Sequence, residues 1–407
     1  MSSQPQHLSP PSAAYIHIPF CRRRCYYCDF PVSIVGDRVM GEQSGTIVEY
    51  VAQLSQEITT SSVSSTRLNT VFFGGGTPSL LAANQVKEIL ATLNRQFGIA
   101  SNAEISMEID PGTFSLEQLQ GYAQAGVNRI SFGVQAFQDD LLKRCGRSHN
   151  VADIFASVEL IRQVGIPNFS LDLISGLPYQ TLQQWQYSLE TAISLAPQHI
   201  SCYDLVLESV TAFGKQYQPG ETPLPDDETT AAMYRLAQQT LTQAGYQHYE
   251  ISNYAKPGYQ CRHNRVYWQN QSYYGFGMGA ASYTHRQRFT RPRTRQAYYD
   301  WVSQGCKIDE PPLSETDVLL ETLMLGLRLA EGVDLANLTQ QFGEAILKPL
   351  WTCLQPYYHQ GWVEIMSQTG ESLTHLNSIP LQGRIRLQDP QGFLFSNTIL
   401  ADIFNQF

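Results

Sequence analysis

The sequence lacks the features that mark several classes of protein. It has no stretch approaching the ~20 apolar residues that a helix needs to cross a bilayer, so no transmembrane segment is expected. Its net charge of −9 provides no electrostatic basis for binding nucleic acid. Residues 1–12 contain no Lys or Arg and no apolar core, so they resemble neither a signal nor a transit peptide and are predicted to form a disordered tail. We therefore expect a cytoplasmic protein.

Cysteine is too sparse for a disulfide framework. The chain has eight cysteines in 407 residues, and only three of them form a pattern, which favours a reducing compartment. The cysteines that we interpret as packing residues are Cys145, Cys202, Cys306 and Cys353. With 43% hydrophobic and 15% charged residues, a chain of this length is predicted to be globular and to contain two or more domains.

The three patterned cysteines, Cys21, Cys25 and Cys28, lie in one short loop. Thiolates are the usual ligands of iron–sulfur clusters, but this Cys-x3-Cys-x2-Cys spacing matches neither of the common ferredoxin patterns. Three thiolates can hold only three irons of a four-iron cluster, which leaves the fourth iron open. A zinc site is the alternative, but zinc prefers four ligands, and the nearest further candidates, His17 and Asp29, would form an unusual set.

Between Tyr15 and Ile251, short β-branched or aromatic runs alternate with longer runs of helical periodicity. The predicted strands are Tyr15–Ile18, Thr70–Phe73, Glu104–Ile109, Arg129–Val134, Phe169–Ile174, His199–Val206 and His248–Ile251. The predicted helices are Ile47–Thr59, Ala83–Phe97, Ser115–Ala125, Val151–Val164, Leu182–Leu195 and Glu228–Ala244. This alternation predicts an α/β fold with a parallel sheet, which forms a partial or complete (β/α) barrel.

Residues able to bind a ligand follow successive predicted strands. They are the run Gly74-Gly75-Gly76-Thr77-Pro78, Glu108, Asp110, Gln135, Arg147 and Asp172. Active sites of barrels gather at the carboxyl ends of the strands, and glycines let a backbone approach a ligand closely. Each residue taken singly could be structural. Because they fall at successive strand ends, together they indicate one ligand site.

Beyond about Arg291 the pattern changes. Helices are predicted over Ser314–Leu329, Asp334–Phe342 and Ile346–Gln360, and a hairpin over Ile385–Phe395 with a type I turn at Asp389-Pro-Gln-Gly392. Helices followed by a hairpin predict a small winged-helix-like domain. We therefore divide the chain into a tail of residues 1–12, a barrel domain of residues 13–290 and a carboxyl-terminal domain of residues 291–407.

With these residues in view, the chain resembles the radical S-adenosylmethionine (SAM) superfamily, and within it the group typified by oxygen-independent coproporphyrinogen III oxidase. The likeness runs from about Tyr15 to the carboxyl terminus. It implies a radical SAM barrel, a HemN-like carboxyl-terminal domain, and a [4Fe–4S] cluster on Cys21, Cys25 and Cys28 whose open iron takes SAM. The resemblance assigns these residues to SAM: Tyr15, Tyr27, Gly75, Gly76, Thr77, Glu108, Gln135, Arg147 and Asp172.

The roles implied by this resemblance suit the side chains. The glycine backbone would meet the methionyl amino group, and Arg147 would pair with the carboxylate of SAM. Asp172 would accept hydrogen bonds from the ribose, and Tyr27 would lie against the adenine. One-electron reduction of the sulfonium would then give methionine and a 5′-deoxyadenosyl radical, so the cofactor would carry the difficult chemistry. The sequence does not identify the electron donor.

Two departures distinguish the chain from the oxidase. In the oxidase a fourth cysteine follows the third after one residue, whereas this chain has Phe30 there. The segment His263-Asn264-x-x-Tyr267-Trp268 resembles a motif of the HemW branch, whose members are haem chaperones that bind haem and transfer it to apo-haemoproteins. We therefore expect a haem chaperone carrying a cluster and SAM, with oxidative decarboxylation of coproporphyrinogen III as the alternative. Whether SAM is cleaved stays open. Family likeness also implies dimerisation linked to cluster assembly.

His263 is the candidate haem contact, because neutral imidazole is a common axial ligand of haem iron. Asn264 or the backbone would hold its other nitrogen. Cys261 is a weaker candidate, since thiolates also bind haem iron. The aromatic residues predicted to offer flat surface to a porphyrin are Tyr267, Trp268, Tyr273, Tyr274 and Phe276. The alternative is an aromatic core cluster that contains a hydrogen-bonded histidine.

Overall fold

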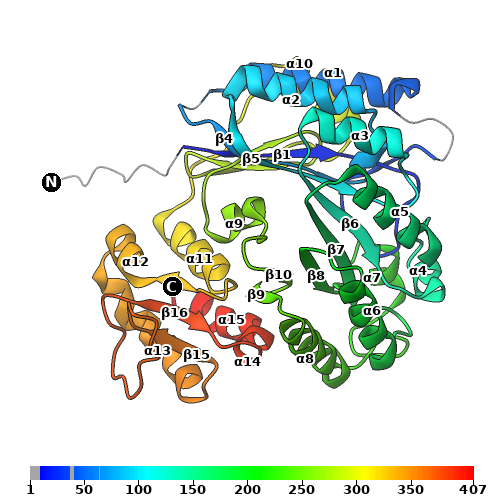
Figure 1. Cartoon of the computed structure of the whole chain (residues 1–407). Coiled ribbons are helices and arrows are strands. Elements are labelled where there is room, and N and C mark those ends of the chain that lie inside the picture. The colour runs from blue at the N-terminus through cyan, green and yellow to red at the C-terminus, as the bar shows by residue number, and fades with distance from the viewer. Residues whose placement is uncertain (1–9, 37–40, 64) are drawn as a thin grey trace.

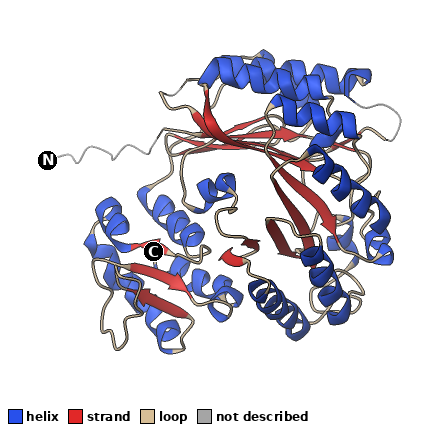
Figure 2. Cartoon of the chain, in the orientation of Figure 1, coloured by secondary structure: helices blue, strands red, loops and turns tan. Residues whose placement is uncertain are grey.

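A nine-stranded sheet forms the larger part of the molecule (Figures 1 and 2). The structure is a computed structural model that describes residues 10–36, 41–63 and 65–407, so most of the predicted tail lies outside the described residues. In sheet order the strands are β11 (Tyr274–Phe276), β1 (Ala13–Ile18), β4 (Leu68–Gly75), β5 (Ile99–Ile109), β6 (Arg129–Gln135), β7 (Asn168–Ser175), β8 (His199–Asp204), β10 (Asn253–Ala255) and β9 (Gln247–Glu250).

The sheet is curved but open. Strands β11 to β8 run parallel, whereas β10 pairs antiparallel with β8 and β9 pairs antiparallel with β10. Within the described ranges no pairing joins β11 to β9, so the predicted barrel is partial. Every strand predicted for this sheet overlaps an observed one, and the two strands of the sheet that were missed, β10 and β11, have only three residues each.

Helices connect most of these strands. They are α1 (Gly45–Thr60), α2 (Ala83–Phe97), α3 (Leu116–Ala125), α4 (Asp139–Arg144), α5 (Val151–Val164), α6 (Leu182–Ser194), α7 (Ala212–Gln216) and α8 (Asp227–Gln243). Figure 1 shows the long helices outside the sheet and α9 (Arg262–Trp268) on its concave side. Local chemistry sets the ends: at α3 the Ser115 side chain accepts from the backbone N–H of Gln118, and Gly126 ends the helix in the left-handed conformation.

Alternation along the strands divides the residues between the two faces. On β6, Arg129, Ser131 and Gln135 line a cavity on the concave side, whereas Ile130 and Phe132 are fully buried in the main hydrophobic core. Successive residues of a strand point to opposite faces, so polar residues at every second position are directed towards one site. The sheet thereby separates the core from the ligand-binding side.

A buried carboxylate joins three segments at the β11 end of the sheet. Glu57 on α1 accepts hydrogen bonds from the Arg291 Nε at 2.8 Å, from the Gly277 backbone N–H at 2.8 Å and from the Tyr298 hydroxyl at 2.6 Å. Arg291 follows the hairpin of β12 (Ala281–Thr284) and β13 (Gln287–Thr290), and Tyr298 lies on α10 (Arg295–Ser303). The bond from Tyr298 therefore fixes α10 to α1, and the ion pair with Arg291 fixes the hairpin to α1.

The carboxyl-terminal part has its own hydrophobic core. Its elements are α11 (Glu315–Gly326), β14 (Val333–Asp334), α12 (Leu335–Phe342), α13 (Leu347–His359), β15 (Val363–Met366), β16 (Arg384–Leu387), α14 (Gln391–Leu394) and α15 (Ser396–Gln406). The strands form a small antiparallel sheet in the order β14-β16-β15. The three helices predicted here are confirmed. The domain boundary near residue 290 stays a prediction.

The predicted hairpin over Ile385–Phe395 is wrong. Strand β16 pairs with β15, which precedes it in the chain, and after Leu387 the chain enters α14 and α15. The reason is the apolar spacing that follows the turn. Ile399, Leu400 and Ile403 are buried in the second core, and this i, i+1, i+4 spacing puts them on one face of a helix but on both faces of a strand.

The carboxyl-terminal part attaches to the end of the sheet opposite to β11. The backbone N–H of Ile251, just after β9, donates to the Arg328 carbonyl at 2.9 Å, and the N–H of Ala330 donates to the Tyr249 carbonyl at 3.0 Å. Tyr234 of α8 also belongs to the second core. Across the described part of the chain, no helix is both long and apolar enough to span a membrane.

Candidate functional site

A cavity of about 540 Å³ lies on the concave side of the sheet. Its wall is formed by the loop of residues 21–32, by residues of β1 and of β4 to β8, and by α9. Every residue that the sequence analysis assigned to the cluster or to SAM lines this cavity, and so does His263. The fold therefore brings together residues that are far apart in the chain, although their individual roles are not fixed by this placement.

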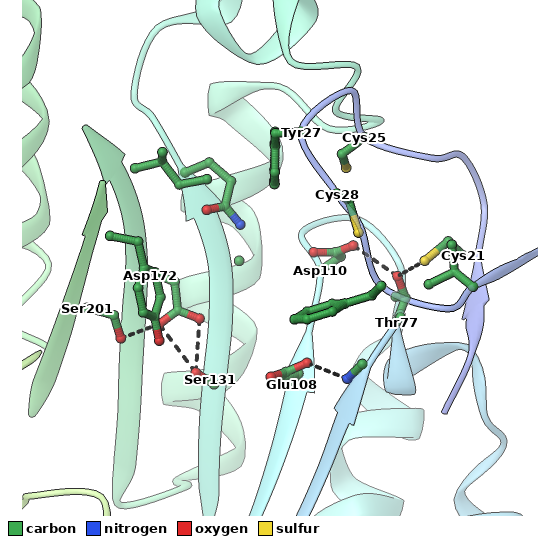
Figure 3. Close-up of a pocket in the computed structure, with 18 of the residues that line it drawn as sticks. Cys21, Cys25, Tyr27, Cys28, Thr77, Glu108, Asp110, Ser131, Asp172 and Ser201 are labelled. Carbon is green, nitrogen blue, oxygen red and sulfur yellow. Dashed lines mark hydrogen bonds between the residues drawn. The ribbon is translucent and has the colours of Figure 1, made fainter. Parts of the chain in front are cut away.

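The cysteine loop forms one side of the cavity (Figure 3). It connects the short strands β2 (Phe20–Cys21) and β3 (Ser33–Ile34), and the three thiols are free and half-buried. The Thr77 hydroxyl lies 3.7 Å from the Cys21 sulfur, and Nη1 of Arg147 lies 3.4 Å from the Cys25 sulfur. Both donors would stabilise thiolates in this loop.

The donor set fits an iron–sulfur cluster better than zinc. Among the described residues, no group of three or more His, Cys, Asp or Glu side chains converges as ligands of a single metal ion would. A cluster binds each thiolate to a separate iron and does not need such convergence. Burial, with a contribution from Asp110, raises the pKa of the Cys21 thiol to about 12, so metal binding there would displace a proton.

The glycine run is hydrogen-bonded to the backbone that leads into the cysteine loop. The backbone N–H of Gly76 donates to the Ile18 carbonyl at 2.9 Å, and that of Thr77 donates to the Phe20 carbonyl at 2.7 Å. A Cβ on Gly76 would lie 2.6 Å from the Phe20 oxygen, and Gly75 has a φ of +108°. The sequence predicted a close approach of this run to a ligand. The structure shows that its own backbone packing already requires glycine.

Carboxylates line the cavity across from the loop. Glu108 accepts the Gly75 backbone N–H at 3.0 Å, and Asp172 accepts from the hydroxyls of Ser201 at 2.7 Å and Ser131 at 3.0 Å (Figure 3). Burial and, secondarily, the charge of Asp172 raise the pKa of Glu108 to about 8. Burial also raises the pKa of Asp172, although both serines oppose this shift. Such acceptors suit the cationic and hydroxyl groups of a nucleoside ligand.

Arg147 is held by Asp110, a residue of the predicted ligand site that the family resemblance did not assign to SAM. Its Nη2 donates to the Asp110 carboxylate and, at 2.9 Å, to the Gly133 carbonyl, while Nη1 is 3.5 Å from the Tyr27 hydroxyl. Asp110 also accepts from the Thr77 hydroxyl at 3.1 Å. Asp110 directly follows β5, two residues after Glu108, so an extended backbone there directs both carboxylates to the same side of the sheet.

Two further predicted residues lie at the cavity wall. Gln135 ends β6 after a bulge that starts at Gly133, and its φ of +69° turns the chain at the cavity. Tyr15 on β1 lines the cavity, and its hydroxyl lies 3.1 Å from Nδ1 of His17. Residues with unusual backbone conformations often occur at ligand sites. Both positions are consistent with contact to a ligand.

His263 lies at the opposite end of the cavity from the cysteine loop, on α9. It is 1% exposed, its Nδ1 is 2.8 Å from the Thr70 hydroxyl, and its Nε2 is 2.7 Å from the Tyr267 hydroxyl. The expected partner, Asn264 or the backbone, is thus replaced by two hydroxyls, because the helix places Tyr267 one turn away. Burial lowers the pKa of His263 to about 3, so the ring is neutral.

The predicted aromatic surface is only partly directed to the cavity. Tyr267 lines it, whereas Tyr274 and Phe276 on β11 pack against Phe97 of α2, with ring centroids 4.6 and 5.8 Å apart. Those two residues therefore belong to the core, as the alternative interpretation stated. Cys261 is fully buried, and its sulfur lies 3.6 Å from the Glu104 carboxylate, which removes it from the cavity wall.

Two family profiles match the chain. The Radical SAM superfamily profile matches residues 15–192, and the HemN C-terminal domain profile matches residues 313–368. The solved structure of coproporphyrinogen III oxidase (HemN) from Escherichia coli, described as a radical SAM enzyme, superposes with a TM-score of 0.79 at 22% identity and covers 97% of this chain and 90% of that one. Fold and site thus define a protein of the radical SAM class, whose cofactors are a [4Fe–4S] cluster and SAM.

The curated relatives specify the family. The haem chaperone HemW of Synechocystis sp. is 49% identical over 399 residues, which are 97% of this chain and 96% of the relative. The haem chaperone HemW of Bacillus subtilis (strain 168) is 37% identical over 368 residues, covering 89% and 95% of the two chains. The chain therefore belongs to the HemW family.

Proposed function

We propose that this protein is a haem chaperone that binds haem and transfers it to apo-haemoproteins. The observation that carries the proposal is the 49% identity to a haem chaperone over nearly the whole of both chains. The cavity supports it, because His263 and Tyr267 of the His-Asn-x-x-Tyr-Trp segment form part of its wall. The serine-bonded carboxylate Asp172 and the cysteine loop lie in the same cavity, so a cluster, SAM and haem would share one site.

We assign Cys21, Cys25 and Cys28 as cluster ligands. Their free thiols face one cavity, and Thr77 and Arg147 provide donors beside two of them. A bound cluster and SAM would supply one-electron chemistry at the sulfonium. The chain itself contributes orientation and charge.

The other assignments concern the binding of SAM. Glu108 and Asp172 would accept from the amino and ribose groups, and Arg147 would balance the carboxylate while Asp110 holds it in place. Tyr15, Tyr27, Gly75, Gly76, Thr77 and Gln135 complete the proposed SAM site. Since Glu108 has a raised pKa, a cationic ligand would bind best to its ionised form.

We propose His263 as the axial haem ligand. Its ring is neutral, which iron binding requires, and its Nε2 would exchange the Tyr267 hydroxyl for iron. The Thr70 hydroxyl would remain on Nδ1 and orient the ring. Haem binding at this position would therefore cost one hydrogen bond and keep the other.

The experiment compares the two candidate activities after anaerobic cluster reconstitution. One sample receives haem, and the other receives coproporphyrinogen III with SAM and a reductant. Stoichiometric haem uptake that weakens in His263→Ala supports the chaperone. Formation of carbon dioxide and protoporphyrinogen would instead establish the oxidase. His285→Ala serves as the matched control, because His285 lies in the β12–β13 turn and outside the cavity.

The remaining proposals concern the surroundings of the protein. We infer that it works in the cytoplasm on apo-haemoprotein clients and that it dimerises when its cluster is assembled. Neither nucleic acid nor membrane is proposed as a partner. Size-exclusion chromatography of cluster-free and cluster-loaded protein would test dimerisation, and an unchanged elution volume would refute it.

A further inference from the structure

Within the described part of the chain, Arg129 is a buried cation that forms no hydrogen bond or ion pair. It is the first residue of β6 and lines the cavity at the amino-terminal end of that strand, away from the cysteine loop. Only 2% of its surface is exposed. Among the residues that the structure describes, its Nε has no hydrogen-bond partner, and the guanidinium forms no ion pair. Its side chain is not assigned to the cluster, to SAM or to the axial site.

An arginine in this state is energetically unfavourable. The guanidinium carries five N–H donors and stays charged at all physiological pH values. Removing such a charge from water without pairing it is costly, so buried arginines in proteins are paired or bind a ligand. Because the side chain borders the cavity, the missing partner is expected there.

Two carboxylates that act on the charge of Arg129, those of Glu104 and Asp172, are already engaged. Glu104 on the neighbouring strand β5 accepts from the backbone N–H groups of Arg262 at 3.1 Å and His263 at 3.0 Å. Asp172 is bonded to Ser131 and Ser201. Burial alone would lower the pKa of Arg129, but the surrounding groups, Cys261 and Glu104 first among them, leave it raised. Glu104 and Asp172 thus favour the charged form of the arginine, but neither accepts a hydrogen bond from it.

We propose that Arg129 anchors a carboxylate of a ligand that enters the cavity besides SAM. If the proposed function holds, this carboxylate is a propionate of haem. Arginine binds carboxylates through two parallel hydrogen bonds, which would fix the rotation of the porphyrin as well as its depth. His263 packs against Thr70 of β4, and only β5 separates β4 from β6, so the two side chains are roughly 10 Å apart across the sheet. A porphyrin with its propionates spans that distance.

The test uses full-length, cluster-loaded protein and two probes, haem and its dimethyl ester, in which both carboxylates are blocked. Absorbance titrations give the dissociation constants. We expect the wild-type chain to bind haem at least tenfold more tightly than the ester. Arg129→Gln should bind haem as weakly as the ester and so lose the discrimination. Arg262→Gln is the matched control, because it removes the same charge from an exposed side chain at the start of α9 and should keep the discrimination.

The other outcomes of these titrations distinguish failure of the proposed anchor from failure of the proposed chaperone function. If the wild-type chain binds the ester as tightly as haem, the anchor is wrong while the chaperone function stands. If neither probe binds, the chaperone function and the anchor both fall. If Arg129→Gln weakens SAM binding and leaves haem binding intact, the carboxylate belongs to SAM and the proposal is overturned. Arg129→Lys keeps the charge but lacks the planar guanidinium, so it should retain the fold and lose most of the discrimination between haem and its ester. If a variant fails to fold, the comparison of haem with its ester in the wild-type chain still tests the anchor.

Discussion

The Nε2 atom of His263 lies 2.7 Å from the hydroxyl oxygen of Tyr267, one helical turn further along α9. Residues four positions apart on a helix face the same side, so the spacing of the motif brings histidine and tyrosine together. The hydroxyl satisfies the nitrogen that iron would use. Both ring nitrogens of the histidine are therefore hydrogen-bonded, and it becomes a ligand only when the bond to Tyr267 is exchanged.

Tyr267→Phe should tighten haem binding. The variant frees Nε2 of His263 and removes a competing bond worth about 1 kcal/mol, which corresponds to roughly a fivefold lower dissociation constant. Absorbance titration with haem measures it. Tyr283→Phe is the control, because the buried Tyr283 hydroxyl has no hydrogen-bond partner among the described residues. Equal or weaker haem binding by Tyr267→Phe would show that His263 is not the ligand.

Cys25→Ser should prevent assembly of a complete cluster. Serine is a poor ligand for iron–sulfur clusters, so reconstituted protein should contain clearly fewer than four irons per chain and should lose the paramagnetic signal on reduction. Cys353→Ser, in which a half-buried thiol of α13 is changed, should reconstitute normally. The assignment fails if the two variants have the same iron content and spectrum.

Glu108→Gln should change how stability depends on pH. The pKa of Glu108 is raised to about 8 from 4.5, so the folded state holds its proton more tightly than the unfolded state, and wild-type stability falls as pH rises across this window. The amide cannot ionise. Relative to wild type, the variant should therefore gain roughly 2 kcal/mol between pH 5 and pH 8, less than the full shift implies because the carboxyl is only partly buried.

Urea unfolding of cluster-free protein at several pH values measures this difference. Glu190→Gln changes an exposed carboxylate on α6 and should show no comparable trend. A constant difference between wild type and Glu108→Gln from pH 5 to pH 8 would contradict the raised pKa.

Gly76→Ala should damage the SAM site without touching a proposed side-chain ligand. The added Cβ would lie 2.6 Å from the Phe20 carbonyl and 2.8 Å from the Ile18 carbonyl, so the backbone that leads into the cysteine loop has to move. Overpacking of this kind costs about 1–3 kcal/mol. We expect at least tenfold weaker SAM binding by calorimetry under nitrogen. Gly45→Ala, whose Cβ would meet nothing within 4 Å, should bind SAM normally; equal affinities would contradict the close packing.

Arg291→Met should destabilise the fold by about 3–5 kcal/mol, because it leaves the fully buried Glu57 carboxylate without its cation. Urea unfolding followed by circular dichroism measures the loss. The double variant Glu57→Gln, Arg291→Met should recover part of it, since the amide that replaces the carboxylate carries no charge. A loss below about 1 kcal/mol in the single variant would mean that the pair is unimportant.

The sequence was most informative where the pattern is local. Strand and helix periodicity predicted the βα units, and the position of polar residues after strands predicted which of them meet in one cavity. Long-range pairings were not accessible in this way. The partners of His263, the bond between Arg147 and Asp110, and the lone Arg129 depend on which strands are neighbours, and a single sequence does not encode that neighbourhood as a pattern.

The error in the carboxyl-terminal part has a similar origin. A turn signal at Asp389-Pro390 is local, but the strand that pairs with β16 comes earlier in the chain, and the buried Ile399, Leu400 and Ile403 have helical spacing. Similarly, Tyr274 and Phe276 are aromatic residues that lie close to His263 in the sequence, yet β11 directs them towards α2. Nearness in sequence did not indicate the face on which a side chain lies.

Because no hydrogen-bond ladder ties β11 to β9 in the described structure, closure does not determine how sharply the sheet bends. The concave face packs against α9 and the side chains beside it, as where His263 bonds to Thr70 of β4, and this packing contributes to the bend. A planar ligand that displaces those side chains would therefore reduce the curvature of the sheet without breaking any pairing between strands. A closed barrel of the same strands could not change its curvature in this way, because its strand pairing would fix it.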